Sequence, residues 1–477
     1  MDDLTLSLSN GTRLVVPRSL SAITTYVVLE QETWFEKEFA FLKHIVRPGM
    51  TAIDIGANLG IYSLELSRLV GPGGRVFAYE PTSATRARLE RSRDLNGATN
   101  LTVIGAALSD SEREGRILFG GSSELNHLGS EGEGEPVAIL TLDAERHRHG
   151  WGAPDFIKMD AEGEEEAIIG GAQALLSESS PILMLEIKAE ANVNEGLAGA
   201  VEELGYRPYR VLPGAPLLVP VDFERVDGYE LNMLAVKPDR AAELEARGLL
   251  IDAAADFSPT DNDVALALVR LRAQPFASSF AAQFAVEVEI HPAYLRALAA
   301  YDVWQRAERS AAQRWGALQY AVRTLTDLVN ADARPARLAS LARMAAEAGS
   351  RMLVAPALQL TVNSVKAGQL QLGEPFWPAH ARYDSIPPGD NPGLWFLCAV
   401  TQQLEESASL STMFEAPTET LRWLCGAPFA TVGMHRRFWL DRVRHGRTYT
   451  PPSVVMTPGP DNLNAELWAD GTVAALA

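Results

Sequence analysis

The stretch 50–62 constrains the fold of this chain more than any other part of its sequence. It opens with an apolar run at 52–55, which suits a buried strand of a parallel sheet. A tight turn with Gly56 and Gly60 follows, and apolar residues then recur at helical spacing over 61–69. A strand, a glycine turn and a helix in this order form a cradle where backbone N–H groups can face a ligand.

The residues around the turn favour one kind of ligand. A dinucleotide fingerprint, G-x-G-x-x-G, presses the backbone against a pyrophosphate, and a nicotinamide dehydrogenase would require it. Here Asp54 stands two residues before Gly56, and Gly60 is the next glycine. A carboxylate at this place disfavours pyrophosphate and suits a ligand that carries an ammonium and a sulfonium, such as S-adenosylmethionine. A turn with only a structural role is the alternative.

Strand and helix patterns alternate from residue 50 to residue 240. This alternation predicts an α/β fold, a doubly wound (Rossmann-like) sheet of seven strands. A β-hairpin in residues 1–30, with a turn at Asn10-Gly11, and a helix with one apolar face from Trp34 to Ile45 precede it. The expected strands are 52–55, 75–80, 101–108, 156–159 and 182–186, followed by a final hairpin of 207–212 and 230–236.

Acidic residues stand at the ends of four expected strands. They are Asp54, Glu80, Asp160 and Glu186. Ligands of doubly wound folds bind outside the carboxyl ends of the strands, so these side chains are expected to face one crevice. Glu80 has the position and the chemistry for holding a ribose diol, because two hydroxyl donors can share one carboxylate.

The length of 477 residues requires more than one domain. We predict an N-terminal hairpin and helix over 1–48 and an α/β domain over 49–240. A mostly α-helical second domain over 241–372 follows, with a helix start at Thr260 but no convincing repeat period, and a Trp- and Pro-rich region over 373–477 ends the chain. The expected roles of the carboxyl-terminal half are homo-oligomerisation or binding of a protein partner, and plain packing is the alternative.

Charge and cysteine content exclude several classes of protein. The formal net charge of −19, from 42 basic and 61 acidic residues, argues against a nucleic-acid partner. Cys398 and Cys425 make neither a disulfide framework nor a metal cluster. The start has no signal-peptide pattern, and no run approaches the roughly 18 apolar residues of a membrane span. We therefore expect a cytoplasmic protein.

Several motifs together resemble the FkbM-type methyltransferase domain, over roughly residues 20–240. The 156–163 segment, Phe-Ile-Lys-Met-Asp-Ala-Glu-Gly, is the most specific of them. The others are the segments 48–50, 53–60, 76–81, 95–96, 141–143 and 171–172, with Glu165. The resemblance implies methyl transfer from S-adenosylmethionine to an oxygen, usually a hydroxyl of a sugar, glycan or natural product.

The resemblance also implies the roles of individual residues. The methionine portion of the cofactor would be surrounded by Asp54, Gly56, Ala57, Asn58 and Gly60. Glu80 would hold the ribose, with Pro81 beside the adenosine, and Ala107 would lie near the adenine. Asp160 would face the amino group or the methyl-transfer centre.

A hydroxyl acceptor must lose a proton, and the chain offers several candidate bases. Asp160 is the first, and Lys158 is the second because apolar surroundings can lower the pKa of a lysine. The alternative is that Lys158 simply pairs with Asp160 on one face of the strand. His127, in an expected mobile loop over 120–135, is either a substrate-side base or merely exposed.

Two further alternatives concern the metal and the activity. Asp160 and Glu186 could share a divalent cation, but no third ligand stands out, so we predict no metal site. The rival to an enzyme is a non-catalytic module that scaffolds the helical half. The cluster of acids argues against it, because a scaffold has no use for them.

Overall fold

The computed structural model divides into two compact units. The first holds Met1–Val211, Pro220–Arg247 and His435–Ala477, and the second holds Leu212–Val219 and Gly248–Met434. The structure describes residues 3–120, 126–129, 134–189, 192–193, 195–223, 230–285, 289–366, 368, 370–415, 419–447 and 450–476. Residues 435–477 thus belong to the α/β unit, whereas the sequence pattern predicts 373–477 as a separate region.

The first unit is built on a mixed sheet with the strand order β15-β14-β16-β11-β10-β3-β4-β5. The strands are β3 (Thr51–Ile55), β4 (Arg75–Tyr79), β5 (Leu101–Ile104), β10 (Phe156–Met159), β11 (Ile182–Glu186), β14 (Arg207–Val211), β15 (Leu218–Pro220) and β16 (Asn232–Val236). Neighbours from β11 to β5 are parallel, and β16 pairs antiparallel with both β11 and β14. The predicted doubly wound sheet is confirmed, and β15 extends it at one edge.

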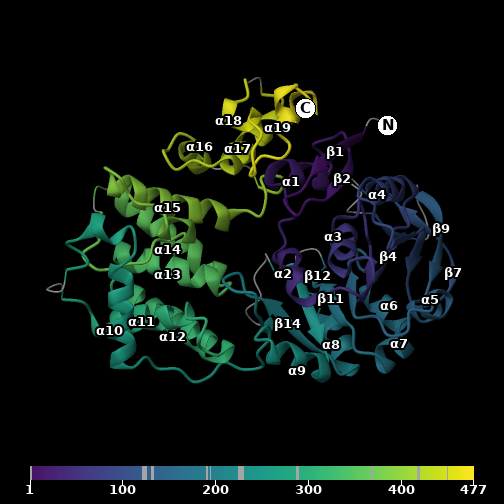
Figure 1. Cartoon of the computed structure of the whole chain (residues 1–477), viewed down its shortest axis with the longest axis horizontal. Helices are drawn as coiled ribbons and strands as arrows, with labels where there is room; N and C mark the ends of the chain where they lie inside the picture. Colours follow the sequence, from purple (N-terminus) through teal and green to yellow (C-terminus); the bar gives the residue numbers. More distant parts are fainter. Residues whose placement is uncertain are drawn as a thin grey trace. The chain divides into compact units, whose positions relative to one another are not determined.

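Helices lie around the central sheet of the first unit in Figure 1, and successive side chains of β3 face opposite sides of that sheet. Ile53 and Ile55 belong to a core cluster with residues of α6 (Glu165–Gly170), α7 (Gln173–Glu178) and α8 (Glu195–Glu203). Asp54 points the other way and accepts a hydrogen bond from Ser63 of α3 (Ile61–Val70). Helices therefore cover both faces, as in doubly wound sheets. The remaining helices of this part are α2 (Lys37–Ile45), α4 (Ser83–Leu95), α5 (Leu142–His149) and α9 (Pro238–Ala246).

The expected third strand, 101–108, is divided between two sheets. Its first part is β5, and its second part, β6 (Ala106–Leu108), belongs to a small sheet of order β6-β9-β7-β8. The other strands of this sheet are β7 (Arg113–Leu118), β8 (His127–Gly129) and β9 (Gly134–Leu140). The expected loop over 120–135 therefore contains β8 and the start of β9, and residues 121–125 and 130–133 of it lie outside the described residues.

The N-terminal hairpin is confirmed, but it is shorter than expected. Its strands are β1 (Asp3–Ser7) and β2 (Arg13–Pro17), and a helix, α1 (Ile23–Gln31), follows within the range predicted as hairpin. Residues 24–30 of α1 are all buried. A helix that is covered on every side shows no amphipathic period, which is why the sequence pattern does not reveal it.

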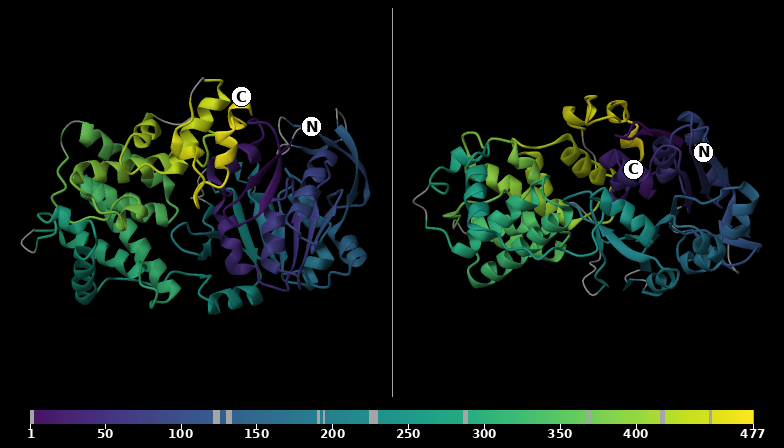
Figure 2. Two further views of the ribbon diagram at one scale, coloured as in Figure 1. Left: turned by 45° about the horizontal axis from the view of Figure 1, so that its top comes forward. Right: turned by 60° about the horizontal axis from the view of Figure 1, so that its bottom comes forward.

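The C-terminal segment of the first unit packs against the end of α1, and both views of Figure 2 show them side by side. Arg436 of α17 (Val432–Arg444) donates to the backbone oxygen of Glu30 at 3.0 Å and forms an ion pair with Glu32 at 3.3 Å. Asn464 donates its backbone N–H to Glu32 and accepts from the Ser7 N–H. The short helices α18 (Ser453–Met456) and α19 (Ala465–Ala469) complete the segment.

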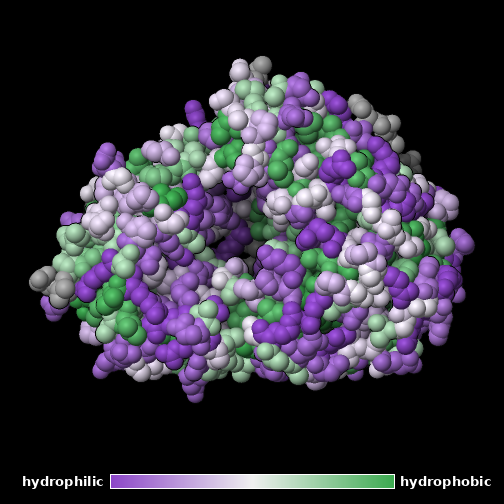
Figure 3. Space-filling model, viewed as in Figure 1, coloured by the Kyte–Doolittle hydropathy of each residue, from purple (hydrophilic) through white to green (hydrophobic). Residues whose placement is uncertain are grey.

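The second unit is helical, as predicted. Capping boxes at Thr260 and Ser310 begin α10 and α12, since each hydroxyl accepts from a backbone N–H of the first turn. The helices are α10 (Asp261–Arg272), α11 (Pro292–Trp304), α12 (Ala311–Ala331), α13 (Pro335–Glu347), α14 (Arg351–Lys366), α15 (Pro392–Ala408) and α16 (Glu419–Cys425). Among the described residues no helix is both long and apolar enough to cross a membrane. Hydrophilic residues separate small apolar groups on the face that Figure 3 shows.

Candidate functional site

A pocket of the first unit lies at the carboxyl ends of the parallel strands. Strands β4 and β5 lie on one side of β3, and β10 and β11 on the other, so the chain reverses its winding direction between β3 and β10. Ligands of open α/β sheets bind at such a point. The pocket lining includes the predicted site residues Gly56, Ala57, Asn58, Glu80, Pro81, Ala107, Lys158 and Asp160. Asp54 and Gly60 are not part of the described lining.

Gly56 forms the floor of the pocket with its backbone alone. Its φ is +73°, and a Cβ there would overlap the carbonyl oxygen of Asp160 and lie 2.8 Å from the carbonyl carbon. The N–H groups of Gly56 and Ala57 both donate to the carbonyl of Tyr79, at 3.1 and 3.0 Å. The turn after β3 is thereby fixed between the ends of β4 and β10.

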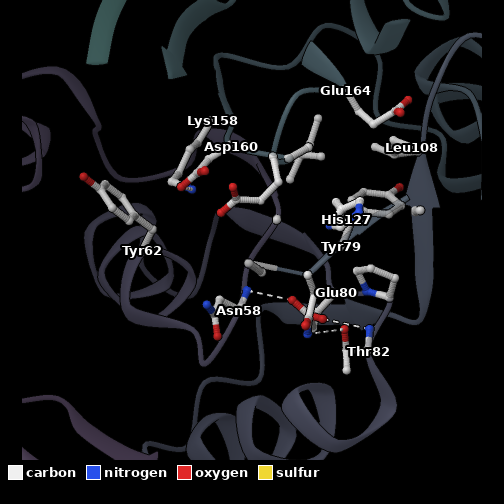
Figure 4. Close-up of a pocket in the computed structure, with 18 of the residues that line it drawn as sticks. Asn58, Tyr62, Tyr79, Glu80, Thr82, Leu108, His127, Lys158, Asp160 and Glu164 are labelled. Carbon is white, nitrogen blue, oxygen red and sulfur yellow. Dashed lines mark hydrogen bonds and ion pairs between the residues drawn. The ribbon is translucent and has the colours of Figure 1, made fainter. Parts of the chain in front are cut away.

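Glu80 is held by backbone amides at one side of the pocket (Figure 4). Its carboxylate accepts from the N–H groups of Asn58 at 2.9 Å and Thr82 at 2.8 Å, and the residue is 6% exposed. Burial raises the pKa of Glu80 to about 7, although these hydrogen bonds partly offset the effect. A carboxylate has about four acceptor positions, so capacity remains for a hydroxyl donor besides the backbone and side-chain groups of Asn58 and Thr82.

Lys158 and Asp160 form an ion pair at another side of the pocket. The Lys158 Nζ lies 2.9 Å from Asp160 Oδ2 and 3.8 Å from Oδ1 of the buried Asp54, and it stands over the Tyr62 ring. Burial alone lowers the pKa of Lys158, but the two carboxylates outweigh burial and raise it. The expectation of a lowered pKa is wrong, and the pairing alternative is confirmed. Lys158 is a fixed cation.

Asp160 has a second acidic neighbour in Glu186, at the end of β11. Burial and the nearby Asp160 raise the pKa of Glu186 to about 10, so its carboxyl group keeps a proton at neutral pH and hydrogen-bonds to Asp160. In the part of the chain that the structure describes, no group of three or more His, Cys, Asp or Glu is arranged to hold a metal ion. The protonated Glu186 carboxyl group donates its hydrogen bond to Asp160.

Sequence reasoning missed the residues of the pocket that precede α2. Trp34 and Glu36 line the pocket, together with Thr24 of α1 and Tyr62 of α3. The predicted helix from Trp34 begins only at Lys37, and Glu36 has an extended backbone. His127, in β8, also lines the pocket, near Tyr79 and apart from Lys158 (Figure 4). No sequence signal distinguishes the extended segment, because its apolar spacing continues that of α2.

Stability of the first unit is expected to fall as pH rises from about 6 to 9. Burial raises the pKa of Glu38 to about 8, of Glu80 to about 7 and of Glu186 to about 10. The folded state therefore binds more protons than the unfolded state above pH 4.5. Each excess proton lowers the free energy of unfolding by about 1.4 kcal/mol per pH unit until the folded group ionises.

Thermal unfolding between pH 6 and 9 measures this dependence. Glu186→Gln, which removes the group with the highest of these three pKa values, is expected to flatten the fall, and Glu114→Gln, at an exposed position, leaves it unchanged. A Tm that stays constant or rises with pH would contradict the assignment of protonated buried carboxyls.

The pocket residues fit S-adenosylmethionine as a ligand. The close approach of backbone at Gly56 leaves no space for a side chain, and the Oδ1 of Asn58 is buried with no hydrogen-bond partner in the described structure. Glu80 can accept a hydrogen bond from a ribose hydroxyl, and Asp160 and Glu36 supply carboxylates for a cationic ligand.

The chain was compared with known proteins. Residues 54–208 match the family model "Methyltransferase FkbM domain". A comparison with curated proteins finds no match. Similar solved structures include methyltransferase FkbM from Methylobacillus flagellatus KT, at 21% identity and a TM-score of 0.29, over 39% of this chain and 43% of that one. This chain thus spans less than half of that protein.

Two other solved structures are also similar to this chain. A SAM-dependent O-methyltransferase from Thermotoga maritima is 19% identical, with a TM-score of 0.27, over 49% of this chain and 77% of that one. Fibrillarin from Aeropyrum pernix, in complex with S-adenosyl-L-methionine, is 12% identical, with a TM-score of 0.26, over 50% of this chain and 99% of that one. The matched residues lie within the α/β unit, so over residues 54–208 this chain carries a domain that matches the FkbM methyltransferase family.

Proposed function

We propose that the protein transfers the methyl group of S-adenosylmethionine to a hydroxyl oxygen of a sugar, glycan or other small molecule. The observation that carries the proposal is the convergence of the Gly56 turn, Glu80 and the Lys158–Asp160 pair on one pocket. The cofactor supplies a methyl group that is already activated on a sulfonium. The protein therefore has mainly to orient the two reactants and to accept a proton.

Each part of the pocket has a proposed task. The backbone of Gly56, Ala57 and Asn58 contacts the methionine portion of the cofactor. Glu80 accepts hydrogen bonds from the ribose hydroxyls, and Pro81 and Ala107 border the adenosine. Asp160 faces the charged end of the cofactor. Asp54 and Gly60 support the pocket without lining it. Asp54 pairs with Lys158 and accepts a hydrogen bond from Ser63, and Gly60 directly precedes α3 with a φ of +96°.

Calorimetry with S-adenosylhomocysteine separates an enzyme from a non-catalytic scaffold. We expect binding to the wild-type protein and a loss of about 10- to 100-fold in affinity for Glu80→Gln, because a charge-assisted hydrogen bond contributes about 1.5–3 kcal/mol. Glu114→Gln, on the exposed side of β7, is the matched control. Absence of binding to the wild type would favour the scaffold.

The affinity is also expected to rise with pH through about 7. The ribose hydroxyls need the ionised Glu80 as an acceptor, and burial holds its pKa at about 7. The wild-type protein should therefore bind S-adenosylhomocysteine more tightly at pH 8 than at pH 6. Glu80→Gln should show a smaller change, and an equal change in both proteins would contradict this role.

The rest of the chain carries weaker proposals. We propose a cytoplasmic location, which the free thiols of Cys398 and Cys425 favour. The helical second unit is proposed to bind a protein partner or a second copy of the chain. Size-exclusion chromatography with light scattering tests the second copy directly.

A further inference from the structure

Most candidate bases of the pocket are already engaged. Lys158 is held as a cation, and Asp160 is bound to Lys158 and to the protonated Glu186. Asp54 is fully buried outside the lining. His127 lies beside Tyr79, where the adenosine side of the pocket is proposed, rather than beside Lys158 and Tyr62 (Figure 4). Besides Asp160 and Glu80, the acids of the lining are Glu36, Glu162 and Glu164, and a proton acceptor at the reacting end must also lie beside Tyr62 and Lys158.

Glu36 meets this requirement. It lines the pocket from the extended segment before α2, and its Oε2 accepts the Tyr62 O–H. Lys158 stands 5.0 Å from the centre of the same tyrosine ring, so Tyr62 links Glu36 to the Lys158–Asp160 side of the pocket. Burial raises the pKa of Glu36, and a carboxylate with a raised pKa accepts a proton more readily at neutral pH.

Trp34 stands beside Glu36 and supplies a second polar group. Its indole N–H is buried and faces Glu36, where it helps to lower the pKa of that carboxyl group. The N–H and the carboxylate are therefore close enough for one hydroxyl group of a ligand to contact both. The indole ring also gives an apolar surface on which a sugar or other ring can lie.

We propose that Trp34, Glu36 and Tyr62 form the acceptor subsite and that Glu36 is the catalytic base. This inference rests on the proposed function. As the acceptor oxygen bonds to the methyl carbon, the carbon–sulfur bond breaks, sulfur keeps the bonding electron pair, and the hydroxyl proton moves to Glu36. The products are the methyl ether, S-adenosylhomocysteine and a neutral Glu36 carboxyl, which later returns its proton to solvent.

The groups that face Glu36 determine what a test must control. They are Tyr62 from α3, Lys158 from β10, Asp160 directly after β10, and Trp34 from its own segment. Lys37 and Glu38 follow in sequence, with Lys37 paired to Glu230. Because the sulfonium charge acts on Asp160 and Lys158 both in the wild-type protein and in a Glu36 variant, the difference between the two proteins isolates the contribution of Glu36.

Proton release on binding tests whether Glu36 lies beside the sulfonium. Calorimetry in buffers of different ionisation enthalpy counts the protons released when S-adenosylmethionine binds and when the uncharged-sulfur product S-adenosylhomocysteine binds. A nearby sulfonium stabilises the carboxylate, so we expect excess proton release for S-adenosylmethionine at pH values where the Glu36 carboxyl group of the free protein is still partly protonated. Glu36→Gln is expected to lose this excess and to weaken binding of S-adenosylmethionine more than binding of S-adenosylhomocysteine.

Two further variants complete the experiment. Glu164→Gln, at another acid of the lining, should keep the excess release. Tyr62→Phe removes a hydrogen bond that lowers the pKa of Glu36, so the excess proton release should occur at higher pH. This variant tests the same contact if Glu36→Gln does not fold. Full excess release in Glu36→Gln, or no shift in Tyr62→Phe, would overturn the assignment. Failure of both ligands to bind the wild-type protein would instead overturn the proposed function on which it rests.

Discussion

Replacing Gly56 by alanine is expected to reduce the affinity for S-adenosylhomocysteine more than 100-fold and to lower the Tm of the first unit. The new Cβ would overlap the Asp160 carbonyl, a backbone group that cannot rotate away, and Gly56 has a φ of +73°. The left-handed conformation costs about 1–2 kcal/mol for alanine, and overpacking adds about 1–3 kcal/mol. Because Asp160 and Gly56 both line the pocket, any shift that relieves the overlap moves the walls apart.

Gly49→Ala is the matched control for this prediction. Gly49 has a φ of +89°, but a Cβ there would meet no atom within 4 Å. The control therefore measures the conformational cost alone, and it should leave ligand binding intact. Calorimetry and thermal unfolding of both variants compare the two effects. Equal losses in Gly56→Ala and Gly49→Ala would show that the approach of the backbone to Asp160 is unimportant.

The part of the site that the sequence predicts is the part set by strand ends. Gly56, Glu80 and Asp160 each follow a buried apolar run, and parallel strands bring such positions to one edge whatever the helices do. Local pattern is sufficient there. It also predicts the pairing of Lys158 with Asp160, because residues two apart in a strand share a face.

The rest of the site depends on contacts between distant segments. Whether Asp54 faces ligand or helix is decided by Ser63 and Lys158, and the pKa of Lys158 by two carboxylates that surround it. Trp34 and Glu36 reach the pocket because the helix begins later than its apolar pattern. The packing of the chain's end against α1 joins residues about 400 apart in sequence, which no local pattern can indicate.

That packing leads to the second large effect, a loss of stability in Arg436→Ala. Arg436 is 4% exposed and contacts the carbonyls of Glu30 and Asp461, the Asn462 side chain and the carboxylate of Glu32. Its removal leaves Glu32, which is 2% exposed, as a buried charge without its cation. Breaking a buried pair in this way costs about 3–5 kcal/mol, and we expect the Tm of the first unit to fall by about 10 °C.

A double variant shows whether the stranded charge causes the loss. Glu32→Gln removes that charge and keeps an oxygen to accept the Asn464 N–H, so Arg436→Ala combined with Glu32→Gln should be more stable than Arg436→Ala alone. Arg447→Ala, at an exposed position of the same segment, should change the Tm little and serves as the control. No recovery in the double variant would mean that lost packing of the arginine, rather than the unpaired Glu32, dominates. Recovery would establish that the C-terminal segment stabilises α1 through this ion pair. Because Thr24 of α1 lines the pocket, the same ion pair would also stabilise the pocket wall.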